Sequence, residues 1–124
     1  MIRVLLVDDH QLVRSGIRRI LDDAADISVV GEAGSGEEAI QMARECRPDV
    51  VLMDVNMPGT SGIDATCQIH QRWPKTIIIG LSMHGKNGDA ARAILDAGAS
   101  AFVPKSEDSS QVIDTILRLF QDRS

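Results

Sequence analysis

Residues 50–59 read VVLMDVNMPG, and this stretch decides the expected architecture of the chain. Four consecutive apolar residues in a run of strand length indicate a strand that is buried on both faces, as in the middle of a parallel sheet. Pro48 precedes the run and ends a helical pattern, whereas Pro58 and Gly59 mark a loop after it. We therefore predict that Asp54 lies at the carboxyl end of a central strand.

Short apolar runs alternate with amphipathic helical patterns on both sides of this stretch. The expected strands are residues 2–7, 27–30, 50–53, 76–81 and 101–103. Each is followed by apolar residues three or four positions apart, and Ser35 with Glu38 fits a capping box at the start of the second helix. This order predicts an α/β fold in which one doubly wound, five-stranded parallel sheet is flanked by five helices.

The composition fits one globular domain over residues 1–124, with 44% hydrophobic and 25% charged residues. No apolar run is long enough for a membrane span and no signal peptide pattern opens the chain, so we expect a cytoplasmic protein. The net charge of −5 argues against direct binding to nucleic acid. Cys46 and Cys67 match no redox motif, and His10, His70 and His84 form no zinc pattern with them.

Polar residues follow four of the five expected strands. Asp8 and Asp9 follow the first strand, Asp54 the third, Ser82 the fourth and Lys105 the fifth. Parallel strands bring their carboxyl ends to one edge of the sheet, so these side chains should meet there. Three neighbouring carboxylates repel one another, and a divalent cation would neutralise them; Mg²⁺ is the natural candidate because it prefers oxygen ligands.

With a cation in place, a carboxylate of this set could attack a phosphoryl group and form an aspartyl phosphate. Asp54 is the expected nucleophile because a loop follows it and leaves room for a donor. Lys105 would supply positive charge to the phosphoryl oxygens, and Ser82 a hydroxyl. Taken singly, Lys105 could be an ordinary surface charge and Ser82 a helix cap; the ordered set of strand ends favours the site.

The motifs that follow the strands resemble those of receiver domains from bacterial two-component response regulators. The matching segments are VDD at 7–9, MDVNMPG at 53–59, LSMH at 81–84, GA at 98–99 and FVPK at 102–105. The resemblance covers essentially the whole chain and is greatest for receivers of LuxR-type (NarL/FixJ) transcription factors. It implies a flavodoxin-like sheet with strand order 2-1-3-4-5.

The resemblance also implies a role for each acidic residue. Asp54 would be the phosphoacceptor and, with Asp9, a direct ligand of Mg²⁺, for which Mn²⁺ could substitute. Asp8 would bind the metal through water, and the main-chain carbonyl of Asn56 would be a further ligand. The protein would thus be no enzyme beyond its own Mg²⁺-dependent phosphorylation and dephosphorylation.

Four further positions complete the set that the resemblance implies. Ser82 and Lys105 would contact the phosphoryl group, and Phe102 would be the aromatic switch residue that follows the Ser82 hydroxyl. We also expect Asn56 and His84 to tune the lifetime of the phosphoryl group, because both should flank the path of the attacking water. The implied partners are a sensor histidine kinase, a second copy of the chain after phosphorylation, and DNA through a C-terminal domain that this chain does not contain.

Two other functions are compatible with the same fold class. A haloacid-dehalogenase-type phosphatase also has an Asp nucleophile with Mg²⁺, but it needs an acid two residues later, and Asn56 stands there. An amide cannot perform that proton transfer. A pseudo-receiver would keep the fold and act only as an interaction module, which the intact acid set disfavours.

Overall fold

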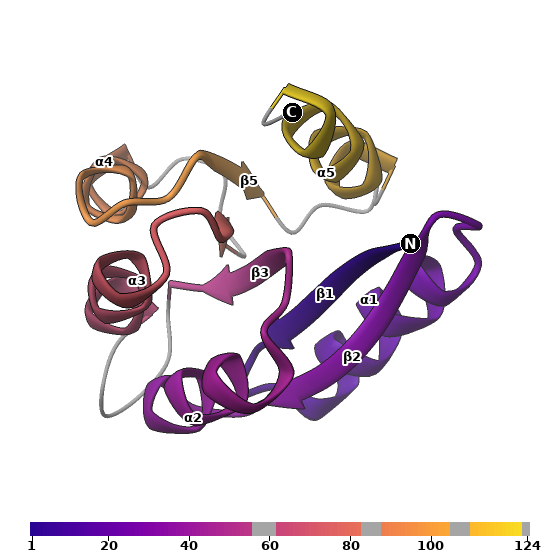
Figure 1. Ribbon diagram of the computed structural model, residues 1–124, viewed down its shortest axis with the longest axis horizontal. Helices are drawn as coiled ribbons and strands as arrows, with labels where there is room; N and C mark the ends of the chain where they lie inside the picture. The colour runs from indigo at the N-terminus through magenta and orange to yellow at the C-terminus, as the bar shows by residue number, and fades with distance from the viewer. Residues whose placement is uncertain (56–61, 83–87, 105–109, 123–124) are drawn as a thin grey trace.

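The computed structural model describes residues 1–55, 62–82, 88–104 and 110–122. Five strands form one parallel sheet in the order β2-β1-β3-β4-β5 (Figure 1). The strands are β1 (Ile2–Val7), β2 (Ile27–Ala33), β3 (Val50–Asp54), β4 (Ile77–Ser82) and β5 (Ala101–Pro104). The helices are α1 (Gln11–Asp22), α2 (Gly36–Cys46), α3 (Gly62–Arg72), α4 (Gly88–Asp96) and α5 (Ser110–Asp122). The expected fold and strand order are confirmed.

Helices cover both faces of the sheet and enclose two hydrophobic cores (Figure 1). One core packs α2, α3 and α4 against the sheet through residues such as Ala39, Ile69 and Ile94. The other packs α1 and α5 against the opposite face through Leu21 and Ile116. Every residue of β3 is buried, as predicted for the central strand. No helix in the described ranges is both long and apolar enough to cross a membrane.

The second strand is longer than expected. We predicted that it ends at Val30, but β2 continues to Ala33. A register shift between Val4 and Leu5 lets residues 31–33 pair with the last three residues of β1. Gly31 and Glu32 interrupt the apolar run, so periodicity alone misses this pairing. The extension matters because it brings Glu32 alongside α1.

Helix α2 begins and ends at the expected residues. The Ser35 side chain accepts a hydrogen bond from the Glu38 N–H at 3.1 Å, while the Glu38 carboxylate accepts one from the N–H of Gly34 at 3.3 Å. The reciprocal bond of the predicted capping box thus goes to Gly34 rather than to Ser35. At the other end, Arg47 adopts a left-handed conformation with φ of 48° and Pro48 follows, which ends the helix.

Charged residues tie α1 to β2 at the end of the sheet where the predicted site lies. Arg14 Nε donates to a Glu32 carboxylate oxygen at 2.9 Å, and the second oxygen is paired with Arg18. The hydrogen bond to Glu32 raises the pKa of Arg18 above its ordinary value, and the nearby charge of Asp22 adds to this. A second nitrogen of Arg14, Nη1, donates to the main-chain carbonyl of Asp8 at 2.6 Å. The cluster therefore fixes the backbone of an expected metal ligand.

Gly62, expected in a loop, is instead the first residue of α3, and it lies against the end of β3. A Cβ added at Gly62 would stand 2.0 Å from the carbonyl oxygen of Asp54. By contrast, a Cβ added at Gly16 on exposed α1 would meet nothing within 4 Å. Gly16 can therefore serve as the control for a substitution at Gly62.

We predict opposite effects for alanine at these two positions. Gly62→Ala should lower the free energy of unfolding by about 2 kcal/mol or more, since a backbone atom has to move. Gly16→Ala should raise it by about 0.5–1 kcal/mol, because alanine favours a helix interior. Urea denaturation followed by circular dichroism measures both. Equal tolerance at both positions would contradict the close approach of α3 to β3.

A second prediction concerns Arg14. Arg14→Leu keeps much of the bulk but leaves the Glu32 carboxylate with one cation and the Asp8 carbonyl without this donor. We expect a loss of about 1–3 kcal/mol in the free energy of unfolding, as for hydrogen bonds that involve charged groups. Arg118→Leu, at an exposed position of α5, is the control and should stay within about 0.5 kcal/mol of the parent. Similar losses in both variants would show that the Arg14 contacts contribute little.

Candidate functional site

The three central strands bring the predicted polar residues to one edge of the sheet. Asp8 directly follows β1, while Asp54 and Ser82 are the last residues of β3 and β4. These strands are neighbours in the sheet. Asp8 and Ser82 are fully buried, Asp54 is 1% exposed, and the Asp9 side chain is 23% exposed. Asp9 is thus the carboxylate of this group that lies nearest to solvent.

The acidic side chains form a compact cluster together with a histidine. Ligand atoms of Asp8, Asp9, His10 and Asp54 all lie within 4.8 Å of one another. His10 Nδ1 is 3.0 Å from a carboxylate oxygen of Asp9 and 3.5 Å from one of Asp8. Sequence reasoning placed the three carboxylates here but missed His10. The available signal was its position directly after the acidic pair.

Three hydrogen bonds from neighbouring segments hold Asp8 in place. Its N–H donates to the carbonyl of Ala33 at 3.0 Å, which continues the pairing of β1 with β2. Its carboxylate accepts the N–H of His10 at 2.9 Å, a bond that turns the chain after the strand. Arg14 binds its carbonyl from α1. Contacts from β2, α1 and the following turn therefore fix both the backbone and the side chain of this buried acid.

Asp54 is positioned by the central strand and by α3. Val55 donates its N–H to the carbonyl of Leu81 at 3.0 Å, so pairing with β4 extends past the end of β3. Gly62 then brings the start of α3 against the Asp54 main chain. The buried acid is thus enclosed by backbone on two sides, and its direction is set by regular elements.

The donor set fits a hard divalent cation. Three carboxylates supply oxygen atoms, which Mg²⁺ prefers, and their mutual repulsion is relieved by a cation between them. Asp8, Asp9 and Asp54 are therefore the described residues that could hold Mg²⁺.

The remaining predicted residues divide between described and undescribed parts of the chain. Phe102 on β5 is partly buried, packs against the core beneath α4 and is paired in register with Gly80 of β4. Ser82 is likewise paired with Pro104 at the end of β5. Asn56, His84 and Lys105 lie outside the described residues, so their predicted roles remain predictions.

Comparison with known proteins gives a consistent family. Residues 4–117 match the family model described as the response regulator receiver domain. The chain is 45% identical over 120 residues to the response regulator UvrY of Escherichia coli, covering 97% of this chain and 55% of that protein. It is 42% identical to GacA of Pseudomonas viridiflava over 97% of this chain and 56% of that protein. The chain thus spans about half the length of these relatives.

Solved structures agree in fold as well as in sequence. A LuxR-family response regulator from Aurantimonas superposes with a TM-score of 0.91 at 38% identity, covering 98% of this chain and 86% of that one. The receiver domain of NarL from Mycobacterium tuberculosis gives a TM-score of 0.88 at 30% identity, covering 95% of this chain and 94% of that one. The chain therefore belongs to the response regulator receiver family, within the LuxR-type group.

Proposed function

We propose that this domain is a phosphorylation switch in which Asp54 accepts a phosphoryl group with the help of Mg²⁺. The observation that carries the proposal is the cluster of Asp8, Asp9 and Asp54 at the end of the central strands, in which Asp8 and Asp54 are buried. Such a cluster is costly to keep without a cation, and a phosphoryl group with Mg²⁺ brings the matching charge. Ser82, which is fully buried, is the last residue of the neighbouring strand β4.

The proposed step moves one phosphoryl group from nitrogen to oxygen. A carboxylate oxygen of Asp54 forms a bond to phosphorus while the bond from phosphorus to the donor imidazole nitrogen breaks. The imidazole of the kinase histidine leaves with the electron pair and takes up a proton. When bound, Mg²⁺ would neutralise charge on the phosphoryl oxygens. Hydrolysis of the aspartyl phosphate later returns the carboxylate and inorganic phosphate.

Structural neighbours support this chemistry. CheY of Borrelia burgdorferi, 26% identical to this chain, was solved in a complex with CheX, BeF₃⁻ and Mg²⁺. The receiver domain of RcsB from Salmonella enterica, 28% identical, was solved with BeF₃⁻ as a phosphomimetic. We infer that the acidic cluster of this chain takes the same type of ligand, with the Asn56 carbonyl completing the metal site and Lys105 contacting the phosphoryl oxygens.

The output of the switch would run through β4 and β5. Ser82 and Phe102 lie on these neighbouring strands. Movement of the Ser82 hydroxyl toward a phosphoryl group would therefore change the packing around the partly buried Phe102 ring. We propose that a sensor histidine kinase phosphorylates the domain and that phosphorylation promotes pairing of two copies. Transcription would be controlled through a C-terminal DNA-binding domain of the whole protein.

The central test is Asp54→Asn. Incubation with acetyl phosphate and Mg²⁺ should add the mass of one phosphoryl group to the parent chain, as measured by intact mass spectrometry, and none to the variant. Asp96→Asn, at an exposed position of α4, should react like the parent. A chelator that removes Mg²⁺ before acetyl phosphate is added should prevent the adduct from forming.

The other readings give different results in the same assay. If the parent binds Mg²⁺ but gains no adduct, the domain is a pseudo-receiver. If phosphate is released over many turnovers, the phosphatase reading replaces the switch. An adduct that persists in Asp54→Asn would show that another residue is the acceptor.

A further prediction concerns the lifetime of the phosphoryl group. Asn56→Ala and His84→Ala should each change the rate of dephosphorylation several-fold, because both side chains are proposed to flank the path of the attacking water. The rate is measured by the decay of the phosphorylated mass after the donor is removed. Arg92→Ala, an exposed position on α4, serves as the control. Unchanged decay in both variants would exclude these residues as tuning positions.

A further inference from the structure

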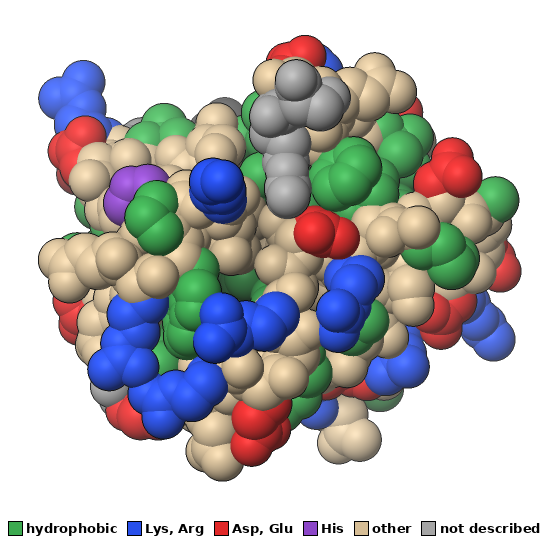
Figure 2. Space-filling view, in the orientation of Figure 1, with side chains coloured by type: hydrophobic (Ala, Val, Ile, Leu, Met, Phe, Trp, Pro, Cys, Tyr) green, Lys and Arg blue, Asp and Glu red, His purple; other side chains and the backbone are tan. Residues whose placement is uncertain are grey.

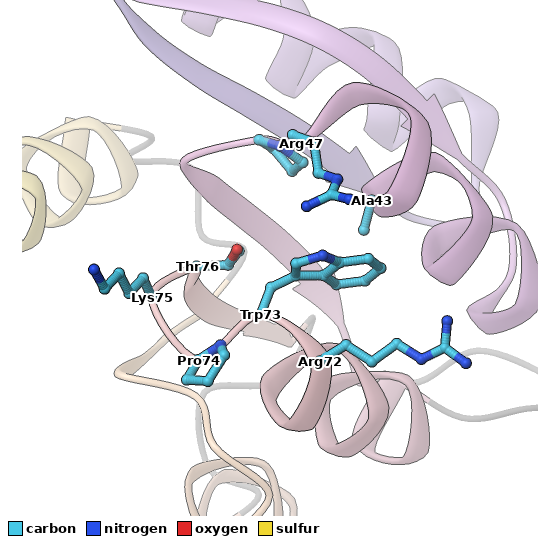
Figure 3. A pocket seen from close by; sticks show the side chains of 8 residues that line it. Ala43, Arg47, Arg72, Trp73, Pro74, Lys75 and Thr76 are labelled. Carbon is cyan, nitrogen blue, oxygen red and sulfur yellow. The ribbon is translucent and has the colours of Figure 1, made fainter.

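A pocket lies at the opposite end of the sheet from the acidic cluster. It has a volume of about 420 Å³ and opens between the end of α2 and the connection from α3 to β4 (Figure 3). Its walls include the indole of Trp73, the rings of Pro48 and Pro74, and the side chains of Arg47, Arg72 and Lys75. We call it the Trp73 pocket. Its size falls in the range of small-molecule sites, about 300–1,000 Å³.

Arg47 and Trp73 form the built part of this pocket. Arg47 directly follows α2 and Trp73 directly follows α3. Their side chains point toward one another (Figure 3), with the guanidinium carbon 5.4 Å from the ring centroid. The left-handed conformation of Arg47 places it here, and its Nε–H donates to the carbonyl of Arg44 at 3.2 Å. A guanidinium has five N–H donors, so this bond leaves four for a ligand. The cation–π contact and this hydrogen bond therefore hold the guanidinium at the pocket, where its remaining donors could bind a negatively charged group.

The pocket carries positive charge on a protein that is acidic as a whole. Figure 2 shows Lys and Arg side chains gathered over the region of α2 and α3, although the net charge of the chain is −5. None of Arg47, Arg72 and Lys75 forms an ion pair with a carboxylate in the described part of the chain. Three cations around one apolar floor favour a ligand with more than one negative charge.

The position of the pocket separates it from the proposed phosphorylation site. Pro48 precedes β3 and Thr76 precedes β4, whereas Asp54 and Ser82 end these strands. The two sites thus lie at the amino and carboxyl edges of the same sheet. A ligand in the Trp73 pocket would have no contact with the acidic cluster.

We propose that the Trp73 pocket binds a small phosphorylated ligand with a flat aromatic ring, of the nucleotide class. The ring would stack on the Arg47 and Trp73 pair, and the phosphate would be held by the free donors of Arg47 with Arg72 and Lys75. The apolar side chains of the pocket favour a ring, and the three cations favour a phosphate. A simple anion would make no contact with the Trp73 indole.

Intrinsic fluorescence offers a direct test because Trp73 is the only tryptophan and the chain has no tyrosine. The 124-residue chain is titrated with adenosine monophosphate and excited at the red edge of the indole band, where purines absorb little. We expect a saturable change in Trp73 emission. Adenosine and inorganic phosphate, each carrying one half of the proposed ligand, should bind at least ten-fold more weakly.

Two variants and one matched control locate the binding. Arg47→Ala and Arg72→Ala should each weaken binding about ten-fold or more, and either can be used if the other is poorly folded by circular dichroism. Arg44→Ala removes the same charge from α2 but not from the pocket wall, and the main-chain acceptor of Arg47 remains. It should bind like the parent.

The remaining outcomes overturn the proposal. Equal weakening by Arg44→Ala would mean diffuse attraction rather than a site. Equal affinity for inorganic phosphate would mean an anion site without ring recognition. If the nucleotide produces no saturable change in Trp73 emission, this ligand class is excluded. An acidic peptide is titrated in the same way, and a response to the peptide alone would identify a protein-docking surface.

Discussion

The burial of like charges at one end of the sheet is the constraint on which the site depends. Asp8 and Asp54 are almost completely withdrawn from water, yet their carboxylates lie in the same cluster as that of Asp9. A buried carboxylate is stable only with hydrogen bonds or opposite charge around it. The main-chain N–H of His10 supplies one such hydrogen bond to Asp8. Positive charge from a bound cation would stabilise the rest.

Regular elements support this charge cluster from several sides, although Asp8 and Asp9 themselves lie just after β1. Parallel order places the ends of β1, β3 and β4 side by side, and hydrophobic cores pack against both faces of these strands. Gly62 lets α3 reach the Asp54 main chain, while Arg14 reaches the Asp8 carbonyl from α1. Both contacts act on backbone atoms. The carboxylates are therefore aimed by the fold before any ligand arrives, which reduces the cost of ordering them on binding.

Local periodicity in the sequence was enough to predict the strands that are buried and the edge where their polar ends meet. Residues 50–54 are all buried, as four successive apolar residues indicated. The same reasoning failed where structure depends on distant partners. The last residues of β2 pair with β1 only after a register shift, and Gly31 breaks the apolar pattern that would have marked them as strand. The Arg14 contact with Asp8 and the stacking of Arg47 on Trp73 depend on side-chain direction and on which helices become neighbours, and neither leaves a local pattern.

The two ends of the sheet differ in charge, and the distance between them limits how they can influence each other. Carboxylates gather where β3 ends, and the side chains of Arg47, Arg72 and Lys75 gather where it begins. Five residues of strand span roughly 15 Å, which exceeds the Debye length of about 8 Å at physiological ionic strength. Direct electrostatic attraction between ligands at the two ends would therefore be weak through solvent. Coupling through the protein interior, where salt screens charges less than in solvent, would run along the packed β3 and β4 strands.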